Sequence, residues 1–224
     1  MSSVETEQIP RTRMPAAERR ELILSEATAV FAANGYGGTT TDLVAQASGV
    51  SQPYVVRMFG TKEKLFLEVL ARAERLLAET FLGAIEEARR AEAADTVASP
   101  AGAVGAEPGS LHERLGMAYV GLIAERGLHQ VLAQAFLLGG DPVIGPEARA
   151  CFLRTWQLIR DKAGFDEHET KQFFANGMLI NTLVALRLAG GHGENPEVDA
   201  MFAVAFPCSF ETYASHLPTA DEPY

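Results

Sequence analysis

Cysteine is scarce in this sequence of 224 residues, and long apolar runs are absent from it. Cys151 and Cys208 are far apart and have no CxxC or Cys/His spacing, which argues against a zinc site or a disulfide framework and predicts two buried thiols. No window approaches the roughly 20 apolar residues that span a bilayer, and residues 1–15 lack a signal-peptide-like apolar segment. We therefore expect a soluble, cytoplasmic protein with no membrane partner.

Strand signals are also scarce, because Val, Ile and Thr rarely alternate with polar residues over a useful length. Apolar residues recur at helical spacing instead. Hydrophobic residues make up 47% of the chain, which is enough for a sizeable core in one large domain or in a small domain and a larger one. These patterns predict an all-α fold.

The charge is mostly acidic and unevenly placed. The formal net charge of -10 argues against a generally basic nucleic-acid-binding surface. Residues 10–64, however, hold seven basic and five acidic side chains, a balance of +2, which leaves -12 on the remainder. Because most of the molecule would repel a polyanion, any nucleic-acid contact is expected in this N-terminal segment.

The N-terminal segment predicts two helices, one after the other. The first, 16–34, is followed by Gly35, which suits a left-handed cap, and its apolar stripe comprises Leu22, Ile23, Ala27, Val30 and Phe31. Three threonines, Thr39, Thr40 and Thr41, then offer N-caps for a short helix that ends at Gly49. No Glu or Gln stands at the position that would complete a capping box.

The stretch GVSQPYVVRMFG carries a proline in the middle of apolar residues. Ser51 is a good N-cap and Pro53 falls in the first turn, where backbone donors have no intrahelical partner, so the proline begins a helix. An inward stripe is formed by Val55, Met58 and Phe59, and the outward residues are Gln52, Pro53, Tyr54 and Arg57. A strand over PYVV is the alternative, since β-branched residues favour it. Gly60 and Thr61 would end this helix and cap a long one that begins at Lys62.

Two short helices joined by a glycine-containing turn form a helix-turn-helix. The stretch TTTDLVAQASGVSQPYVVRMFGTKEKLFLEVL resembles the DNA-binding domain of the TetR family of bacterial transcriptional regulators. The resemblance covers residues 17–77 and includes the upstream FAANGYGGTT, the Ala-x-x-Gly-Val-Ser turn and the Phe-x-x-Lys-Glu ending. It implies an N-terminal three-helix DNA-binding domain with the motif at 40–59 and a larger C-terminal helical ligand-binding and dimerisation domain at 78–217, flanked by a flexible arm (1–16) and a tail (218–224).

The resemblance implies a set of DNA-binding residues: Thr40, Thr41, Ser51, Gln52, Pro53, Tyr54, Arg57 and Lys62. Side chains such as Gln52 and Arg57 suit adenine and guanine edges, and Lys62 suits a phosphate. The sequence departs from the family at Pro53, where glycine is frequent, and at Val56, where a phosphate-binding tyrosine is common. Tyr54 or Arg57 is then left to supply the missing contact. Arg11 and Arg13 lie in the N-terminal arm. They either enter the minor groove of the DNA or belong to a disordered segment.

Helical spacing continues through the rest of the chain. The helix from Lys62 is expected to reach about Arg90 with a break near Gly83, and 91–109 reads as a mobile loop because it is rich in Ala, Gly and Pro. Ser110 caps the next helix. Further helices are predicted near 111–125, 128–138, 143–163, 166–189 and 196–214, the last of them kinked or ended by Pro207.

The last two predicted helices are apolar on more than one face. The resemblance implies that they pair with a second subunit in a four-helix bundle, and a deep core within one subunit is the alternative. The predicted dimer contacts are Phe173, Phe174, Met178, Asn181, Phe202, Phe206 and Phe210. The predicted lining of a ligand pocket is Phe81, Met117, Tyr119, Gln134, Phe136, Phe152 and Trp156, for each of which core packing is the alternative.

An enzyme is the competing class of function, and little in the sequence supports it. The five histidines are scattered, and none belongs to HExxH or to a nucleophile pair, so we expect no catalytic residue, metal or cofactor. The acidic cluster at 166–169 reads as a solvated helix cap and not as a metal site. We therefore expect a homodimeric repressor that leaves its double-stranded DNA operator when an unknown small-molecule effector binds, with coupling through the helix that begins at Lys62. Alternatives are a helical enzyme or small-molecule-binding protein with a vestigial helix-turn-helix, and an architectural DNA-binding protein without an effector.

Overall fold

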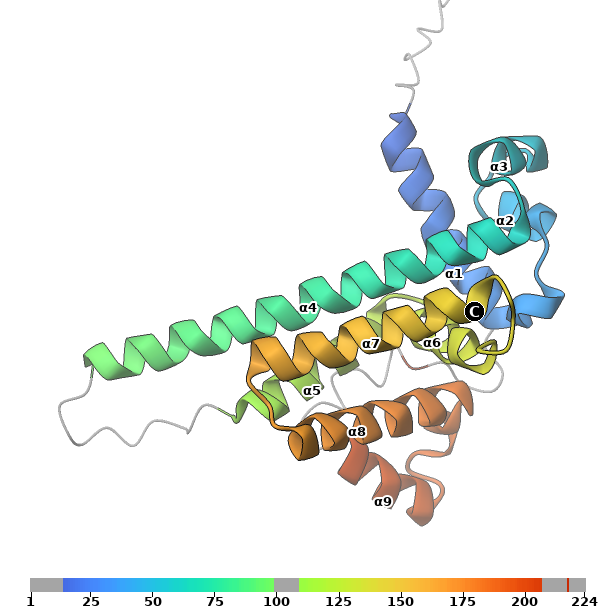
Figure 1. Ribbon diagram of the computed structural model, residues 1–224. Helices are drawn as coiled ribbons and strands as arrows, with labels where there is room; N and C mark the ends of the chain where they lie inside the picture. The colour runs from blue at the N-terminus through green and yellow to red at the C-terminus, as the bar shows by residue number, and fades with distance from the viewer. Residues whose placement is uncertain (1–13, 99–108, 207–216, 218–224) are drawn as a thin grey trace, which may run out of the picture.

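The computed structural model describes residues 14–98, 109–206 and 217, and within these ranges the chain is helical with no strand (Figure 1). The α-helices are α1 (Ala16–Gly38), α2 (Thr41–Ala47), α3 (Gln52–Phe59), α4 (Lys62–Ala98), α5 (Leu111–Gly121), α6 (Leu128–Leu137), α7 (Ile144–Ala163), α8 (Glu167–Ala185) and α9 (Pro196–Ala205). Two short 3-10 helices, η1 (Leu122–Ala124) and η2 (Leu188–Gly191), connect them. The all-α prediction is confirmed. None of the described helices is both long and apolar enough to cross a membrane.

Glycine and threonine set the boundary between α1 and α2. Gly35 has φ +68°, a value that L side chains rarely adopt, and the chain turns there before one last helical turn. The Thr39 N–H donates to the Gly35 carbonyl at 3.1 Å. Thr40 is the N-cap of α2, and its hydroxyl accepts a hydrogen bond from the Leu43 N–H at 3.2 Å. The predicted cap positions are confirmed.

Pro53 lies in the first turn of α3, as predicted, and the strand alternative is wrong. Ser51 is the N-cap, although its side chain makes no capping hydrogen bond. Its carbonyl instead accepts from the N–H groups of Tyr54 and Val55. The proline therefore costs α3 no hydrogen bond, because the donor that it lacks would have no partner within the helix.

Helix α4 is longer than the sequence indicated. It continues through Gly83, so the predicted break is wrong, and through residues 91–98, so that part of the predicted loop is helical. Gly83 is exposed and has good helix formers around it, and one such glycine costs only about 1 kcal/mol. Residues 91–94 read AEAA, which strongly favours a helix. Residues 99–108, the rest of the predicted loop, lie outside the described residues.

The C-terminal helices end earlier than predicted. The segment 166–189 stops at Ala185, because Arg187 takes the left-handed backbone conformation with φ +54° and a 3-10 turn follows. Helix α9 ends at Ala205, and Phe206 is its C-cap, next to Pro207 in the sequence. Residues 207–214 of the predicted last helix lie outside the described ranges. Helix α5 gives way to η1 after Gly121 and so falls short of 125.

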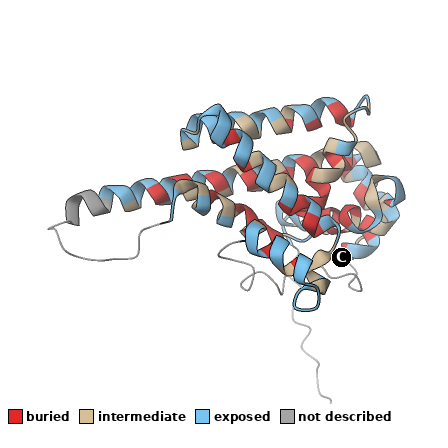
Figure 2. Cartoon of the chain, turned by 90° about the horizontal axis from the view of Figure 1, so that it is seen from below, coloured by how far each residue is buried: buried red, intermediate tan, exposed pale blue. Residues whose placement is uncertain are grey.

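Helix α4 forms the axis of the molecule. It packs against α1 and α3 at one end and against α5, α6 and α7 further along, so the predicted domain boundary at 77/78 falls inside one continuous helix. Buried residues gather where these helices cross (Figure 2). A single apolar cluster runs from Ile23 in α1 to Phe206 after α9. The two ends of the molecule therefore share one core.

Candidate functional site

The short helices α2 and α3 form a helix-turn-helix on an apolar base. Val44 and Ala45 of α2 and Val55 and Phe59 of α3 are buried against the core. This packing fixes α3 by one face and turns the other outward at the end of the molecule (Figure 1). The residues on the outer face of α3 are Gln52 and Tyr54, which are partly buried, and Pro53, Val56 and Arg57, which are exposed.

Two of the predicted DNA-binding side chains, Gln52 and Thr41, hold the two helices of the motif together. The side-chain amide of Gln52 donates from Nε2 to the Thr41 hydroxyl at 3.1 Å, which ties the start of α3 to the start of α2. The Arg57 guanidinium lies 5.1 Å from the centre of the Tyr54 ring. Arg57 has no carboxylate partner within the described part of the chain, so its N–H donors remain available to a phosphate or a guanine.

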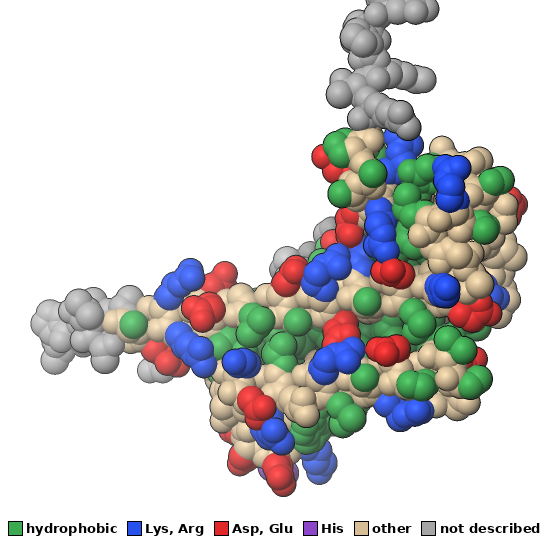
Figure 3. All heavy atoms as spheres, turned by 45° about the horizontal axis from the view of Figure 1, so that its top comes forward, with side chains coloured by type: hydrophobic (Ala, Val, Ile, Leu, Met, Phe, Trp, Pro, Cys, Tyr) green, Lys and Arg blue, Asp and Glu red, His purple; other side chains and the backbone are tan. Residues whose placement is uncertain are grey.

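The start of α1 lies beside α3 and adds a residue that the sequence reasoning missed. Arg19 lines an open groove together with Met14, Pro15 and Tyr54. Its neighbour Arg20 is instead paired with a carboxylate of α4. Arg19 could have been found from the helical pattern alone, because it lies on the polar side of α1 in the first turn. Lys and Arg side chains are interspersed with acidic ones on this face (Figure 3).

Lys62 has a structural contact that its position in the sequence does not reveal. Its ammonium donates to the Tyr36 carbonyl at 3.0 Å and lies 4.6 Å from the centre of the Tyr36 ring. Both contacts join the start of α4 to the end of α1, beyond the Gly35 turn. Lys62 therefore positions the helix-turn-helix. An ammonium group has three N–H donors, so this contact leaves a donor for a phosphate.

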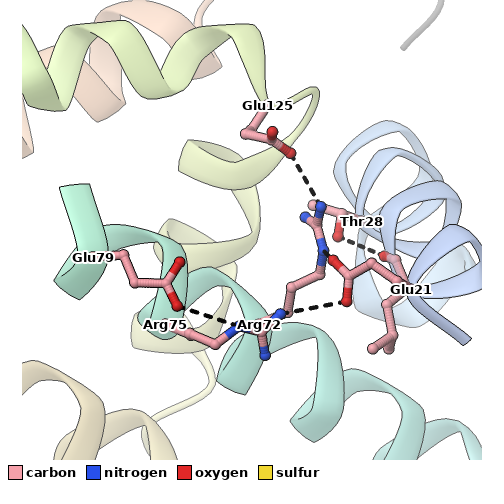
Figure 4. Close-up of polar contacts among 7 residues, drawn as sticks. Glu21, Thr28, Arg72, Arg75, Glu79 and Glu125 are labelled. Carbon is pink, nitrogen blue, oxygen red and sulfur yellow. Dashed lines mark hydrogen bonds and ion pairs between the residues drawn. The ribbon is translucent and has the colours of Figure 1, made fainter. Parts of the chain in front are cut away.

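A cluster of ion pairs joins α1, α4 and the turn before α6 (Figure 4). The side chain of Arg72 on α4 is only 8% exposed, and it binds Glu21 of α1 at 2.6 Å and Glu125 at 3.2 Å. Arg75 adds a second contact to Glu21 at 3.3 Å. A guanidinium that is buried to this extent needs carboxylate partners. Arg72 therefore holds both α1 and the turn before α6 to the same point of α4.

Helix α1 also touches the start of α6 directly. Gly127, the residue before α6, has φ +82°, and a Cβ atom there would lie 2.6 Å from the Ala32 Cβ and 2.8 Å from the Thr28 carbonyl oxygen. Further along α6, Gln134 donates from Nε2 to the Phe31 carbonyl at 2.9 Å. These contacts leave no room for a side chain between the two helices at Gly127.

A narrow cavity of about 40 Å³ lies between α4, α5, α6, α7 and α8. Its lining is Leu77, Phe81, Tyr119, Leu132, Phe136, Cys151, Phe152, Thr155, Phe173, Phe174, Gly177 and Met178. None of these lining side chains carries a formal charge at neutral pH. Burial raises the pKa of the Cys151 thiol to about 12, so the thiol stays protonated and is a poor nucleophile.

Buried polar side chains stand behind one wall of the cavity. The Tyr119 hydroxyl donates to Asn181 Oδ1 at 2.6 Å, and the ring of His129 packs edge-to-face on the Tyr119 ring with centres 4.8 Å apart. Burial lowers the pKa of His129 to about 4, so the imidazole is neutral at pH 7. Within the described chain, His129 Nε2 and Asn181 Nδ2 are buried without a hydrogen-bond partner.

The acidic cluster at the start of α8 is a helix cap. Asp166 accepts a hydrogen bond from the Glu169 N–H at 2.8 Å, and Glu169 accepts one from the Asp166 N–H at 2.9 Å. Ser110 and Glu113 form the same reciprocal capping box at α5. In the part of the chain that the structure describes, no three potential metal-ligating side chains come together.

Comparison with known protein families matches residues 23–69 to the bacterial regulatory proteins of the tetR family. The matched residues run from α1 into α4 and contain the whole helix-turn-helix. Residues 23–69 therefore resemble the DNA-binding domain of the TetR family.

Individual relatives agree with this assignment. The HTH-type transcriptional activator FasR of Mycolicibacterium smegmatis is 40% identical over 60 residues, which are 27% of this chain and 27% of FasR. Two solved structures share the TetR fold at low identity. A TetR-like regulator from Rhodococcus sp. RHA1 has a TM-score of 0.54 and 20% identity over 87% of this chain and 97% of its own. PfmR from Thermus thermophilus has a TM-score of 0.53 and 18% identity over 89% of this chain and 99% of its own.

The cavity contains four of the seven residues that the TetR resemblance assigned to a ligand pocket, namely Phe81, Tyr119, Phe136 and Phe152. The other three lie elsewhere. Met117 is 44% exposed beside α9, and Gln134 is bonded to α1. Trp156 packs against Phe174 with ring centres 5.1 Å apart, so it stands directly behind the cavity wall.

Most residues that the resemblance assigned to a dimer interface are used inside the subunit. Phe173, Phe174 and Met178 line the cavity, and Asn181 is bonded to Tyr119. Two more, Phe202 and Phe206, are buried, and Phe210 lies outside the described residues. The large apolar side chains that α8, its C-cap and α9 do expose are Leu179, Leu186, Met201 and Val204.

Proposed function

We propose that this protein is a TetR-family DNA-binding regulator of transcription that inserts α3 into the major groove. The observation that carries the proposal is the helix-turn-helix, whose second helix, α3, is held by Val55 and Phe59 and presents Arg57 outward without a carboxylate partner in the described chain. The family match supports it. Because the remainder of the chain is acidic and repels DNA, we expect DNA contact at this end only, and a protein that works on DNA in the cytoplasm.

The side chains on the outer face of α3 suit different contacts with the DNA. Arg57 suits the O6 and N7 atoms of guanine, and Gln52 suits adenine if its amide exchanges the Thr41 hydroxyl for the base. Tyr54 lies near Arg19, so either residue can replace the phosphate contact that Val56 cannot make. The remaining assigned residues, Thr40, Thr41, Ser51, Pro53 and Lys62, stand at helix starts, where backbone N–H groups also attract phosphates.

A homodimer is part of the proposal. Two copies of α3 must be about 34 to 36 Å apart, or a multiple of that distance, to enter successive major grooves on one side of the DNA. The exposed apolar residues Leu179, Leu186, Met201 and Val204 offer a surface for a second subunit. This set replaces the buried aromatic residues as the proposed interface.

Regulation by a small molecule is the finer part of the proposal. Leu77 and Phe81 of α4 line the cavity, and α4 also carries Arg72, which binds Glu21 of α1. A ligand that shifts α4 or α6 changes the separation of the two α3 helices, provided that it binds the two arrangements unequally. By linkage, DNA weakens the ligand by the same factor, typically 5 to 150-fold for a coupling of about 1 to 3 kcal/mol.

We propose repression, relieved when the ligand releases the DNA. The relative FasR is named an activator, which makes activation the second candidate. A reporter gene downstream of a selected operator separates them, because deleting the regulator raises expression if it represses and lowers expression if it activates.

Selection of random DNA by the purified protein tests DNA recognition, and Gln52→Ala tests base readout. We expect the wild type to enrich one two-fold symmetric sequence. The variant should lose about 1 to 3 kcal/mol of binding at one base position in each half-site and little elsewhere. An equal loss on every sequence would mean that Gln52 only supports Thr41, and no enrichment by the wild type would refute the proposed function.

Lys62→Ala separates phosphate binding from the structural contact with Tyr36. If Lys62 reaches a phosphate, the slope of log K against log salt should become less steep by about 0.9. Lys162→Ala, which removes the same charge at the far end of α7, is the control and should leave the slope unchanged. Weaker DNA binding with an unchanged slope would show that Lys62 acts only by holding α1 to α4.

A further inference from the structure

We propose that Arg72 is a positioning residue for DNA recognition, because it binds α1 and the turn before α6 at once. Through these two contacts, the Arg72 bridge, it fixes the angle of the helix-turn-helix to the rest of the subunit and so sets the spacing of the two operator half-sites. The part that concerns the operator rests on the proposed function. The part that concerns the angle rests only on contacts within the subunit.

Helix α1 decides how α3 is oriented. Helix α3 packs on α2 and α4, and α2 packs on α1. Helices α1 and α4 also reach the C-terminal helices, since α1 packs on α6 and α4 packs on α5, α6 and α7. The angle of α1 to α4 and α6 therefore determines where the outer face of α3 points.

The Arg72 bridge holds this angle with a rigid group (Figure 4). The Nε atom of Arg72 donates to Glu21 Oε1 on α1 at 2.6 Å, and its Nη2 atom donates to Glu125 Oε2 in the turn before α6 at 3.2 Å. A guanidinium is planar and its N–H groups point in fixed directions, so the two carboxylates are held in one relative position. Helix α1 cannot swing away from the turn without breaking one of the two contacts.

The burial of Arg72 makes the loss of either contact costly. The Arg72 side chain is 8% exposed, whereas Glu21 is 48% and Glu125 is 41% exposed. If α1 moved, the carboxylates would regain water, but the guanidinium would stay in the interior with fewer partners, which is strongly unfavourable. The bridge therefore resists rotation of α1 more than an exposed ion pair would.

A second attachment to α1 lies about three turns further along the helix. Gly127 comes so close that a Cβ atom there would lie 2.6 Å from the Ala32 Cβ, and Gln134 donates to a carbonyl of α1 at 2.9 Å. Ala32 follows Glu21 by 11 residues, which is roughly 16 Å along a helix. A helix held at two points this far apart cannot tilt about either one. Without the Arg72 bridge, α1 should pivot about the contact at Gly127.

Operator spacing depends on this angle. One base pair inserted between two half-sites moves them about 3.4 Å apart and rotates one by about 35° relative to the other, since a turn of DNA is about 34 to 36 Å and 10 to 10.5 base pairs. A dimer whose α3 helices are fixed cannot follow that change, whereas a dimer whose α1 helices pivot can follow it. We expect the wild type to require one spacing and a protein without the bridge to accept several.

Arg72→Met tests the bridge with operators that differ only in spacing. Methionine is tolerated at a buried ion-pair position, and the two carboxylates left behind are exposed enough to be hydrated. The probes are the selected operator and the same DNA with one base pair inserted or removed between the half-sites. The wild type should bind the selected operator at least tenfold more tightly than either altered one, and Arg72→Met should reduce this ratio at least threefold.

A duplex with one half-site has no spacing, so the folded variant should bind it within twofold of the wild type. An unchanged spacing ratio in folded Arg72→Met would overturn the proposal. Circular dichroism shows whether each variant is folded.

Glu125→Ala and Arg75→Met separate the bridge from the charges around it. Glu125→Ala removes only the link to the turn before α6 and should relax the spacing ratio as Arg72→Met does. Arg75→Met removes an exposed contact to Glu21 at 3.3 Å, leaves both contacts of Arg72 in place, and should keep the wild-type ratio. A wild-type ratio in Glu125→Ala, or equal relaxation in Arg75→Met, would overturn the role of the bridge.

Two spin labels measure the angle without DNA. They are attached at Val56→Cys on α3 and Leu153→Cys on α7, both of which are exposed positions. The background carries Cys151→Ala and Cys208→Ala, and an excess of unlabelled protein ensures that a dimer holds one labelled subunit. Double electron–electron resonance should give a distance distribution at least twice as wide with Arg72→Met as without it. Equal widths would overturn the proposal.

The two measurements distinguish failure of this proposal from failure of the proposed function. A protein that enriches no DNA sequence, but whose distance distribution broadens in Arg72→Met, keeps the bridge and loses the proposed function. A protein that enriches an operator, but shows the same spacing ratio and the same width in Arg72→Met, binds DNA without depending on the bridge.

Discussion

Gly127→Ala should lower the free energy of unfolding by about 2 to 5 kcal/mol. The left-handed backbone at Gly127 costs a residue with a Cβ about 1 to 2 kcal/mol. The new Cβ would also lie 2.6 Å from the Ala32 Cβ and 2.8 Å from the Thr28 carbonyl oxygen. Relieving these contacts requires α1 and α6 to separate, and overpacking of this kind costs a further 1 to 3 kcal/mol, roughly. Urea unfolding followed by circular dichroism measures the loss.

Gly164→Ala is the matched control for this prediction. Gly164 follows α7 with φ +74°, but no atom within 4 Å would meet its Cβ. It should therefore show only the backbone cost of about 1 to 2 kcal/mol. Equal losses in the two variants would mean that α1 and α6 separate freely at Gly127, and that this contact does not hold the helix-turn-helix to the rest of the molecule.

The helix-turn-helix could be predicted from the sequence because its signals are local. A glycine with positive φ at position 35, a capping hydroxyl at Thr40 and a proline in the first turn of α3 each act within a few residues. The inward positions of α3 follow from helical geometry alone. The structure confirms these features, and residues 23–69 are also the segment that matches the family.

The contacts between the two ends of the molecule could not be predicted, because they join residues far apart in sequence. Arg72 and Glu21 are 51 positions apart, and Gln134 and Phe31 are 103 apart. Nothing near Gly127 in the sequence shows that α1 will lie against it. A glycine before a helix reads only as a turn, and only the tertiary structure shows that it leaves space for another backbone.

Helices α8 and α9 show a second limit of what the sequence can predict. Apolar residues lie on more than one face of α8, which predicts burial on most sides, but about half of the helix is exposed in the subunit. The pattern also does not say which partner buries each side. Phe173 faces the cavity of its own subunit, whereas Leu179 on the same helix is 41% exposed. The prediction of a dimer interface therefore selected mainly aromatic side chains, and those among the described residues lie in the interior of the subunit or line its cavity.

Acidification from pH 7 to about pH 4.5 should destabilise the protein through His129. Burial holds the pKa of this imidazole at about 4, against about 6.5 for an exposed histidine. Between these two values the unfolded chain binds a proton that the folded protein does not. The stabilising contribution is therefore complete above pH 6.5, falls as the pH drops below it, and is lost near pH 4. At about 1.4 kcal/mol per pKa unit, the full loss is about 3 kcal/mol.

Urea unfolding at a series of pH values from 7.5 to 4.5 measures this loss, and His129→Gln is the variant that isolates it. The lowered pKa values of Glu63, Asp141 and Asp161 make their contributions disappear only as the pH falls below the ordinary values for these carboxyl groups, so His129 dominates the upper part of the window. His129→Gln should be less stable than the wild type at pH 7.5, because it disturbs the packing on Tyr119, but its stability should change little down to pH 5. His168→Gln, at an exposed position of α8, should keep the wild-type slope. If the slope survives in His129→Gln, the proton is taken up elsewhere, and the imidazole behind the cavity wall is not held neutral by burial.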